Sequence, residues 1–425
     1  MRRSFAMLSA FLLTLGTGPA QAGTPSFLTA VPLKHVVQSG DDTLRTRARK
    51  AIYSALKHTG TTVQLARPDV AKLTAGSPVT IEYLGRSYTI RPTRTMRRSA
   101  GDFTWYGDVP DVHGRAIFVV RNGRTTGAIS GDRGTITVAS VAGGMTLMTQ
   151  RKSFPPDHPA SFTATQKRAR ARFEPLLAEL KAIHAAAQVD EFQAQLAPQV
   201  THQRVLVGYT STVLQTHPDV LDTIRLAIEQ TNAAYGTSGV QVALDLAGTF
   251  QTSFVEAGTV EADLALLTGE QLVQCLRKKA GADLVIVLIE DDDACGDSAA
   301  VFADADAAYS VVNAECAVAN LSFAHEVGHL QGARHDLKND PASPFDNGHG
   351  FAYPPGRWRD IMAYPCDEPA TCDRQPFFSN PAKRHDGVAT GDERSNNAWV
   401  INHTAPSIAE LHKKLADRDC PTQPQ

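Results

Sequence analysis

The sequence predicts an α+β fold, with a β-rich region over residues 79–149 and a region of alternating strands and helices that opens at residue 203. Short β-branched and aromatic runs separated by glycine-containing turns fill the first region. The second region begins with a strand, a helix with apolar residues three and four positions apart, and three further strands. A histidine-bearing helix and a long irregular tail follow, an order that suits α+β architecture, with α/β as the alternative.

The expected strands of the first region are β-branched or aromatic segments, and Asn122-Gly123 and Gly143-Gly144 mark turns between them: Val79–Tyr83, Ser87–Ile90, Ala116–Val120 and Thr135–Val138. Residues 43–58 read as a helix. Residues 164–195, rich in Ala, Arg, Lys, Glu and Gln, read as a helical or flexible connector.

The expected strands of the second region are Gln203–Tyr209, Gly239–Leu244, Ala282–Ile289 and Ala308–Asn313. Residues 282–289 are apolar enough to be buried on both faces of a sheet. A helix over 219–235 is predicted by the helical spacing of its apolar residues, and further helices are expected over 396–400 and 408–415.

The N-terminus has the three parts of a signal peptide in order. Arg2 and Arg3 precede the short apolar run Leu8–Leu15, and Ala20-Gln21-Ala22 supplies small residues for cleavage. We therefore expect residues 1–22 to be removed on export, which makes the protein secreted, either extracellular or periplasmic. No apolar run reaches the roughly 20 residues of a membrane span.

The net charge of −2 conceals a division between the halves of the chain. Residues 1–200 hold 26 Lys and Arg against 13 Asp and Glu, a net of +13, whereas residues 201–425 hold 16 against 31, a net of −15. A basic arm can bind nucleic acid, but a basic segment that docks on an acidic domain explains both halves. We predict a pro-segment over 23–198, a catalytic domain over 199–425 and no nucleic-acid partner.

All six cysteines lie after residue 270. An even number in an exported chain indicates disulfides, and six cysteines allow 15 pairings. Cys366–Cys372, which closes a short loop, is the first expected pair, and Cys295–Cys316 is the second.

The residues that carry chemistry form one motif, His325-Glu326-Val327-Gly328-His329 followed by Gly332 and His335. His325 and His329 are four residues apart and therefore share one face of a helix. A glycine adopts positive φ without strain and commonly ends a helix, so the chain can turn at Gly332 and return His335 to the same point.

Three neutral imidazoles suit one Zn²⁺ ion and leave a fourth position for water, which is typical of catalytic rather than structural zinc sites. Such an ion lowers the pKa of water and polarises a carbonyl group. Glu326, about 100° around the helix from His325, is the candidate general base.

The motif resembles that of the metzincin metalloproteases at every fixed position of residues 325–335. By this resemblance Met362 forms the methionine turn beneath the metal, and Tyr364 is a candidate contact to the transition state. The blocks Tyr309–Asn313, Ser322–His329, Ile361–Cys366 and Phe378–Pro381 are similar to bacterial reprolysin-like enzymes of the peptidyl-Asp metalloendopeptidase family. The resemblance implies a metzincin-type domain with a twisted mixed sheet, preceded by the β-rich pro-domain, and a zinc endopeptidase of protein and peptide substrates.

The same resemblance implies cleavage before aspartate, and an acidic side chain in the S1′ pocket needs a cation. Arg374, Lys383 and Arg384 follow the methionine turn and are the candidates. A broad or apolar P1′ preference is the alternative, and a non-catalytic secreted zinc-binding module is a third interpretation that the presence of Glu326 disfavours.

The pro-segment has no cysteine to cap the zinc. Latency is then steric or uses a carboxylate or a histidine, the candidates being His35, His58, His113, His158 and His184. Glu290-Asp291-Asp292-Asp293 offers oxygen ligands for Ca²⁺, although its spacing favours a solvated acidic loop over a calcium site.

Overall fold

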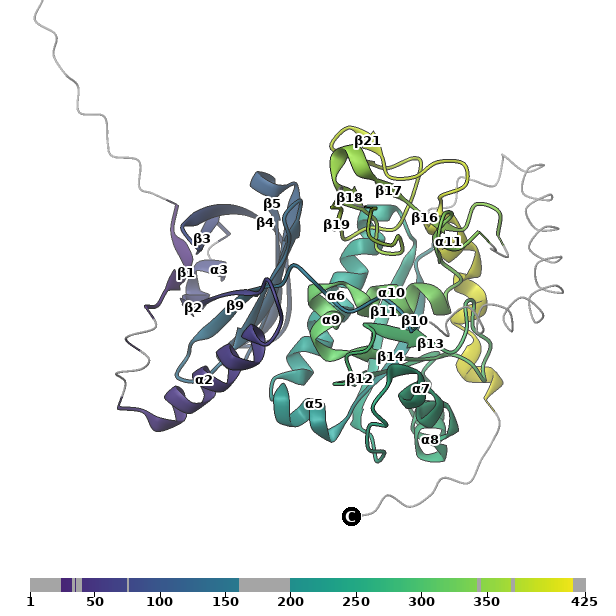
Figure 1. Ribbon diagram of the computed structural model, residues 1–425, viewed down its shortest axis with the longest axis horizontal. Helices are drawn as coiled ribbons and strands as arrows, with labels where there is room; N and C mark the ends of the chain where they lie inside the picture. Colours follow the sequence, from purple (N-terminus) through teal and green to yellow (C-terminus); the bar gives the residue numbers. More distant parts are fainter. Residues whose placement is uncertain are drawn as a thin grey trace, which may run out of the picture.

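The computed structural model describes residues 24–32, 35, 40–74, 76–159, 199–341, 345–367 and 371–415. The predicted signal peptide, the whole of the predicted connector and His184 lie outside these residues. The described residues form two folded parts, an N-terminal part to the left in Figure 1 and a C-terminal part to the right. None of the described helices is long and apolar enough to cross a membrane.

The N-terminal part is a closed barrel of nine strands in the order β1-β2-β9-β8-β7-β6-β5-β4-β3. Its strands are β1 (Ser26–Ala30), β2 (Thr62–Pro68), β3 (Val79–Tyr83), β4 (Arg86–Ser99), β5 (Asp102–Val109), β6 (Gly114–Arg121), β7 (Arg124–Gly131), β8 (Gly134–Ser140) and β9 (Thr146–Gln150). All four predicted strand segments of this region lie within these strands. Barrel closure, by the parallel pairing of β1 with β3, was not predicted.

Two helices accompany the barrel, α2 (Asp42–Leu56) and α3 (Val70–Thr74), with a 3₁₀ turn at Pro110–Val112. The helix predicted over 43–58 is confirmed as α2, which covers a small apolar cluster with Leu65 and Leu147 of β2 and β9. Asp41 caps its N-terminus by accepting a hydrogen bond from the Leu44 backbone.

The C-terminal part is built on a five-stranded mixed sheet of order β11-β10-β12-β14-β13. Its strands are β10 (Thr201–Tyr209), β11 (Val242–Gln251), β12 (Leu284–Ile289), β13 (Gly296–Ser298) and β14 (Tyr309–Asn313). Only β13, the edge strand, pairs antiparallel. The predicted mixture of helices and strands is confirmed, and the strand expected at Gly239 begins three residues later because Gly239 ends the preceding helix in a left-handed conformation.

Helices cover both faces of this sheet. They are α5 (Ser211–Thr216), α6 (Val220–Ser238), α7 (Val260–Gly269), α8 (Gln271–Ala280), α9 (Ala314–Ala319), α10 (Ser322–Leu330) and α11 (Asn397–Ile408). Alternate residues of β12 enter two cores: Ile286 and Leu288 pack with α6 and α10, whereas Val285 and Val287 pack with α7. The prediction that this strand is buried on both faces is confirmed.

The two helices predicted near the C-terminus need correction. Ile408 is the last residue of α11, which includes Pro406, and only a 3₁₀ turn over Leu411–Lys414 follows. After α10 the chain is largely irregular, with short pairs β15 (Arg334–Asp336), β16 (His349–Gly350), β17 (Ala352–Tyr353), β18 (Trp358–Arg359), β19 (Asp373–Arg374), β20 (Arg384–His385) and β21 (Val388–Ala389), and a 3₁₀ turn over Pro354–Gly356. Both expected disulfides, Cys295–Cys316 and Cys366–Cys372, are present.

The two parts share an interface centred on α6. Residues of β6 alternate between the barrel interior, which receives Phe118, and the outer face, where Ile117 and Val119 join the core of the C-terminal part. Complementary charges surround these apolar contacts. Asp222 of α6, only 2% exposed, pairs with Arg121 at 2.5 Å and Arg124 at 2.8 Å, which places two basic barrel residues against a buried carboxylate of the helix.

Candidate active site

Helix α10 and the turn after it bring His325, His329 and His335 together. The helix places the first two one turn apart, and Gly332, at φ 103°, turns the chain so that His335 returns to them. The Nε2 atoms of the three rings lie 3.0–3.2 Å from one another. The expected helix end at this glycine is confirmed, because α10 ends at Leu330.

Backbone carbonyls fix which nitrogen of His325 and of His329 faces the centre. His325 Nδ1 lies 2.8 Å from the Ile361 oxygen, and His329 Nδ1 lies 2.9 Å from the Ala333 oxygen. An Nδ1–H that donates to a carbonyl leaves Nε2 as an unprotonated acceptor. Burial holds the pKa of these imidazoles well below its ordinary value, so the rings are neutral.

A fourth imidazole completes the cluster. His158, from the segment after the barrel, places its Nε2 2.9 Å from that of His325 and 3.0 Å from that of His329. Its Nδ1 lies 3.1 Å from the Gly296 carbonyl. Burial lowers its pKa to about 4. Four buried histidines thus direct ring nitrogens at one point.

This arrangement fits a divalent cation. Converging lone pairs repel one another unless a positive charge lies between them. Four nitrogens at about 2.0–2.1 Å from a tetrahedral Zn²⁺ ion would be roughly 3.3 Å apart, close to the distances observed. An all-nitrogen donor set of neutral imidazoles suits Zn²⁺ better than Ca²⁺ or Mg²⁺, which prefer oxygen.

Glu326 lies beside the histidines and is completely buried. Its Oε2 accepts a hydrogen bond of 2.6 Å from Ser298 Oγ on the edge strand β13. Its Oε1 has no hydrogen-bond partner among the described residues and lies 3.7 Å from His158 Nδ1. Burial raises the pKa of this carboxyl well above its ordinary value. The unpartnered oxygen is the chemically available atom beside the cluster.

Met362 lies directly under helix α10, which carries His325 and His329. Its side chain is fully buried, and a methyl group added at Gly328 would meet Met362 Sδ at 2.9 Å and Phe378 at 3.0 Å. The glycine between the two helical histidines therefore allows the sulfur to approach the helix. Asp360 holds this turn, because its Oδ1 accepts hydrogen bonds from the backbones of Met362 and Ala363.

Tyr364 packs against one histidine of the cluster. Its ring centroid is 4.3 Å from that of His335, and its backbone N–H donates to Asp336 at 3.0 Å. Burial raises the pKa of the phenol, so the hydroxyl stays protonated and can donate a hydrogen bond.

One of the three predicted S1′ cations is at the site. Arg374 is buried and its Nη2 lies 2.6 Å from Asp157 Oδ2, with Arg359 Nη1 3.7 Å from the same oxygen. The candidates Lys383 and Arg384 are exposed instead, and Arg384 donates to the Gly387 carbonyl of its own hairpin β20–β21. All three cations follow the methionine turn in the sequence, but the path of the chain in three dimensions decides which of them is buried.

Several residues around the site, Asp157 among them, were not predicted. Ser298 and Arg359 belong to segments with no motif, so the sequence carried no signal for their roles. Asp360 did carry one, since a short acidic side chain that precedes a turn often accepts hydrogen bonds from the following backbone N–H groups. The edge strand β13, next to Glu326, is only three residues long and was also missed.

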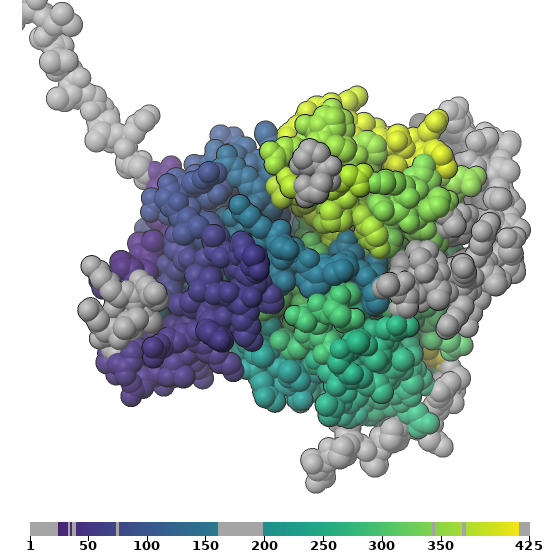
Figure 2. Space-filling view, in the orientation of Figure 1, coloured from purple at the N-terminus to yellow at the C-terminus, as the bar shows by residue number. Residues whose placement is uncertain are grey.

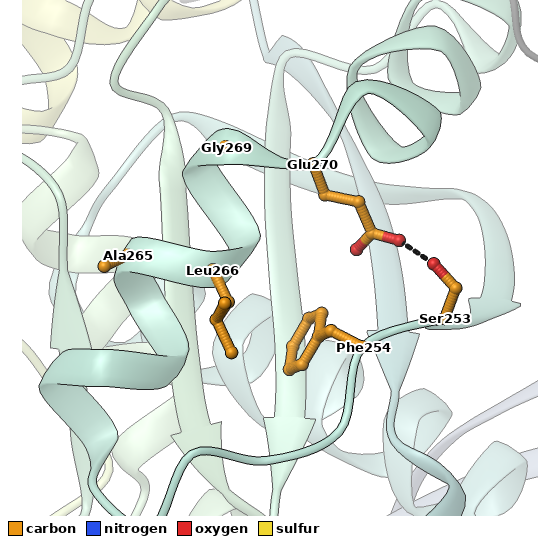
Figure 3. A pocket seen from close by; sticks show the side chains of 6 residues that line it. All are labelled: Ser253, Phe254, Ala265, Leu266, Gly269 and Glu270. Carbon is orange, nitrogen blue, oxygen red and sulfur yellow. Dashed lines mark hydrogen bonds between the residues drawn. The ribbon is translucent and has the colours of Figure 1, made fainter.

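The C-terminal part also contains a pocket and a cluster of carboxylates away from the histidines. A shallow pocket between the end of β11 and α7 is lined by Ser253, Phe254, Ala265, Leu266, Gly269 and Glu270 (Figure 3). Its one carboxylate, Glu270, accepts a hydrogen bond from Ser253, and the pocket is lined by no histidine, cysteine or second carboxylate that could act with it. The carboxylates of Glu256, Asp263 and Asp291 form a second cluster.

Known proteins resemble this chain over most of its length. The model of reprolysin-like metallopeptidases of family M12B matches residues 199–396. The peptidyl-Asp metalloendopeptidase of Stenotrophomonas maltophilia strain R551-3 is 30% identical over 374 residues, which cover 82% of this chain and 86% of that protein. The protein of the same name from Xanthomonas campestris pv. campestris is 28% identical over 405 residues, covering 88% and 93%. The chain therefore belongs to the peptidyl-Asp metalloendopeptidase family of reprolysin-like metallopeptidases.

Proposed function

We propose that this protein is a secreted zinc endopeptidase in which His325, His329 and His335 hold the metal and Glu326 is the general base. The observation that carries the proposal is the unpartnered, buried Oε1 of Glu326 beside three imidazole nitrogens that converge on one point. Family membership supports endopeptidase activity and disfavours a non-catalytic zinc-binding module.

Each residue of the site has its own role in the proposed hydrolysis of a peptide bond. A bound Zn²⁺ ion would polarise the scissile carbonyl and lower the pKa of water. Glu326 Oε1 takes a proton from the attacking water and gives it to the leaving amine. Ser298 donates a hydrogen bond to the other oxygen of the carboxylate. We propose that the hydroxyl of Tyr364, whose ring packs on His335, donates to the developing oxyanion.

We further propose a preference for aspartate at P1′. Arg374 and Arg359 form a buried cationic pair close to the metal site, and a carboxylate already lies between them in this structure. A buried guanidinium favours a carboxylate partner because an apolar side chain would leave its charge unpaired. The names of the relatives support the same preference, and a broad or apolar preference is the alternative.

We also propose that the protein is exported and made with a pro-segment. Residues 1–22 act as the signal peptide, residues 23–198 as a pro-segment and residues 199–425 as the catalytic domain. The charge division, the disulfides and the separate barrel support this arrangement.

We also propose a Ca²⁺ ion at the three carboxylates of Glu256, Asp263 and Asp291, in place of the run 290–293 taken as a whole. Asp263 is fully buried, and its Oδ2 and that of Asp291 have no hydrogen-bond partner among the described residues. Clustered anionic oxygens repel one another, and a hard cation with oxygen ligands relieves that repulsion.

The test uses protein purified from the culture medium and a peptide set that differs only at P1′ (Asp, Asn, Ala and Leu). Wild-type protein should cleave the Asp peptide best, and Glu326→Gln should lose about 10²–10⁴-fold in kcat while retaining one zinc ion. The exposed Glu393→Gln is the matched control. Full activity of Glu326→Gln would refute the role of the base, and equal cleavage of all four peptides would refute the aspartate preference.

A further inference from the structure

The segment Pro155–His158 lies in the active site although it belongs to the N-terminal half of the chain. Figure 2 shows the residues after the barrel, in blue, running across the C-terminal part between its green and lime regions. Asp157 and His158 are only 8% and 6% exposed. Two polar side chains so buried against another part of the chain are held by specific contacts.

Backbone hydrogen bonds attach this segment to the edge of the sheet. The Pro156 carbonyl accepts from the Cys295 N–H at 2.7 Å, and the Asp157 carbonyl accepts from the Gly296 N–H at 3.1 Å. The two donors lie where the edge strand β13 begins, because Gly296 is the first residue of that strand. The edge strand β13 is next to Glu326, so a peptide bound here lies over the catalytic residues.

The two side chains at the end of the segment contact two different groups of residues in the site, the histidine cluster and the pair Arg374 and Arg359. His158 Nε2 adds a fourth nitrogen to the histidine cluster, with its ring centroid 4.9–5.0 Å from the other three. Asp157 pairs with Arg374 and Arg359 and also accepts a hydrogen bond from Asn320 Nδ2 at 3.2 Å. Burial opposes its ionisation, yet the two guanidinium charges leave its pKa below the ordinary value.

We propose that Asp157 and His158 keep the full-length enzyme latent by imitating a substrate: His158 closes the open position of the metal, and Asp157 fills the cation pocket. The inference rests on the proposed function, because it assigns Arg374 and Arg359 to the acidic side chain of the substrate. A metal site with four protein ligands is of the closed, structural type and has no position for water. Glu326 then has no water to deprotonate.

The barrel keeps the segment in place because the two are covalently connected and the barrel is docked on the C-terminal part. The segment follows strand β9 of the barrel directly, and the barrel is anchored on α6 by Asp222 with Arg121 and Arg124 and by Asp102 with Arg225. A tethered ligand has a high effective concentration, so weak individual contacts suffice. Cleavage in the connector and release of the barrel would remove the tether and free the site.

The first experiment measures the coordination of the bound metal and does not depend on activity. Full-length protein is loaded with Co²⁺, and its visible absorption is followed while azide is added. In the wild type four nitrogen ligands exclude azide and the spectrum stays constant. In His158→Ala the open position accepts azide and the spectrum shifts. His158→Gln is measured in parallel, with thermal unfolding as the check that both variants fold.

The matched control is His35→Ala, which changes an exposed histidine of the N-terminal half and should behave as the wild type. An equal azide response in the wild type and in His158→Ala would overturn the fourth-ligand assignment. Failure of the wild type to bind one Co²⁺ would overturn the metal site of the proposed function itself. Zinc loss to excess chelator should also be at least about tenfold faster from His158→Ala, since an exposed ligand position admits the chelator.

The second experiment tests the imitation of substrate. The full-length double variant Asp157→Asn, His158→Ala should cleave an Asp peptide without processing. Added Pro-Pro-Asp-His peptide should inhibit it at least about tenfold better than Pro-Pro-Asn-His, a difference of roughly 1.4 kcal/mol. Equal inhibition by the two peptides would refute the role of Asp157, and a double variant that binds Co²⁺ but stays inactive would refute latency through this segment.

Discussion

Asp157 and Arg374 are 217 residues apart in the sequence, yet Asp157 Oδ2 and Arg374 Nη2 are separated by 2.6 Å. Both side chains are buried. Arg374 also donates to the Asn320 carbonyl at 2.9 Å, which fixes the guanidinium toward the segment that carries the carboxylate. This one ion pair joins the N-terminal half of the chain to the proposed specificity pocket.

Replacement of Arg374 should remove the preference for aspartate. In processed protein, Arg374→Ala should lower kcat/KM for the Asp peptide by about 10²-fold or more, because a buried site built for a charged group discriminates strongly. The Asn peptide should change little, so the ratio of kcat/KM values for the two peptides is the measurement. Lys383→Ala, at an exposed position, should leave that ratio unchanged, and a similar fall there would contradict the assignment.

Gly328 should tolerate no side chain, whereas another helical glycine should. Gly328→Ala places a methyl group 2.9 Å from Met362 Sδ and 3.0 Å from Phe378, and we expect a loss of about 1–3 kcal/mol in unfolding free energy. Gly236→Ala in α6 meets nothing within 4 Å and should stabilise by about 0.5–1 kcal/mol. Denaturant unfolding of the two variants measures the difference. Equal effects would show that close packing beneath the histidines is not the reason for glycine there.

Removal of metal should destabilise the full-length protein because four lone pairs then face one another. Chelation should lower Tm by several degrees, since a ligand bound only by the folded state at 100 times its Kd adds about 2.7 kcal/mol. Readdition of Zn²⁺ should restore Tm. The decrease should be smaller in His158→Ala, which has one ligand fewer, and an unchanged Tm after verified metal loss would argue against a metal that links the two halves.

Docking of the barrel should weaken slightly as pH rises. His113 of the barrel lies 2.6 Å from Asp132 and 3.1 Å from Asp386 of the C-terminal part, with His385 on the other side of Asp132. The hydrogen bond with Asp132 raises the pKa of His113 above its ordinary value of 6.5. Asp132 belongs to the same barrel, so its hydrogen bond with His113 is present whether or not the barrel is docked. The attraction between protonated His113 and Asp386 crosses the interface and favours docking. The contribution of His113 to the free energy of docking is complete below pH 6.5, its ordinary pKa. This contribution is lost as the pH rises through the raised pKa of His113 in the docked protein.

Because His113 is largely exposed, the effect should be at most about 0.5 kcal/mol. The measurement is the difference in Tm between full-length wild type and His113→Asn across this pH range, which should shrink as pH rises. His202→Asn, whose partner Asp245 lies in the same part of the chain, is the control. A difference that grows with pH would contradict the sign.

The calcium proposal is tested by charge removal. In chelator-treated protein, Asp263→Asn should raise Tm, because it relieves repulsion with Asp291. With Ca²⁺ added the order should reverse, since the wild type gains a bound cation and the variant loses a ligand. Thermal unfolding at both conditions decides the matter, and a wild-type Tm that ignores Ca²⁺ would refute the site.

Local sequence patterns were sufficient to predict many of the helices and strands of this protein. Helical spacing placed His325 and His329 on one face, Gly332 marked the end of α10, and alternation or continuity of apolar residues located β3, β6, β10, β12 and β14. These features depend on neighbours within about one turn or one strand, so the sequence determines them directly. The same holds for the charge division, which requires only counting.

Tertiary structure alone decided the features that depend on distant segments. His158 was one of five candidate histidines, and nothing local distinguished it. Arg374 and Lys383 follow the same turn, but only the path of the chain buries one and exposes the other. Closure of the barrel and the hydrogen bonds of residues 156–157 with Cys295 and Gly296 join segments far apart in sequence. Such contacts arise from packing and hydrogen bonding in three dimensions, and a one-dimensional pattern does not record them.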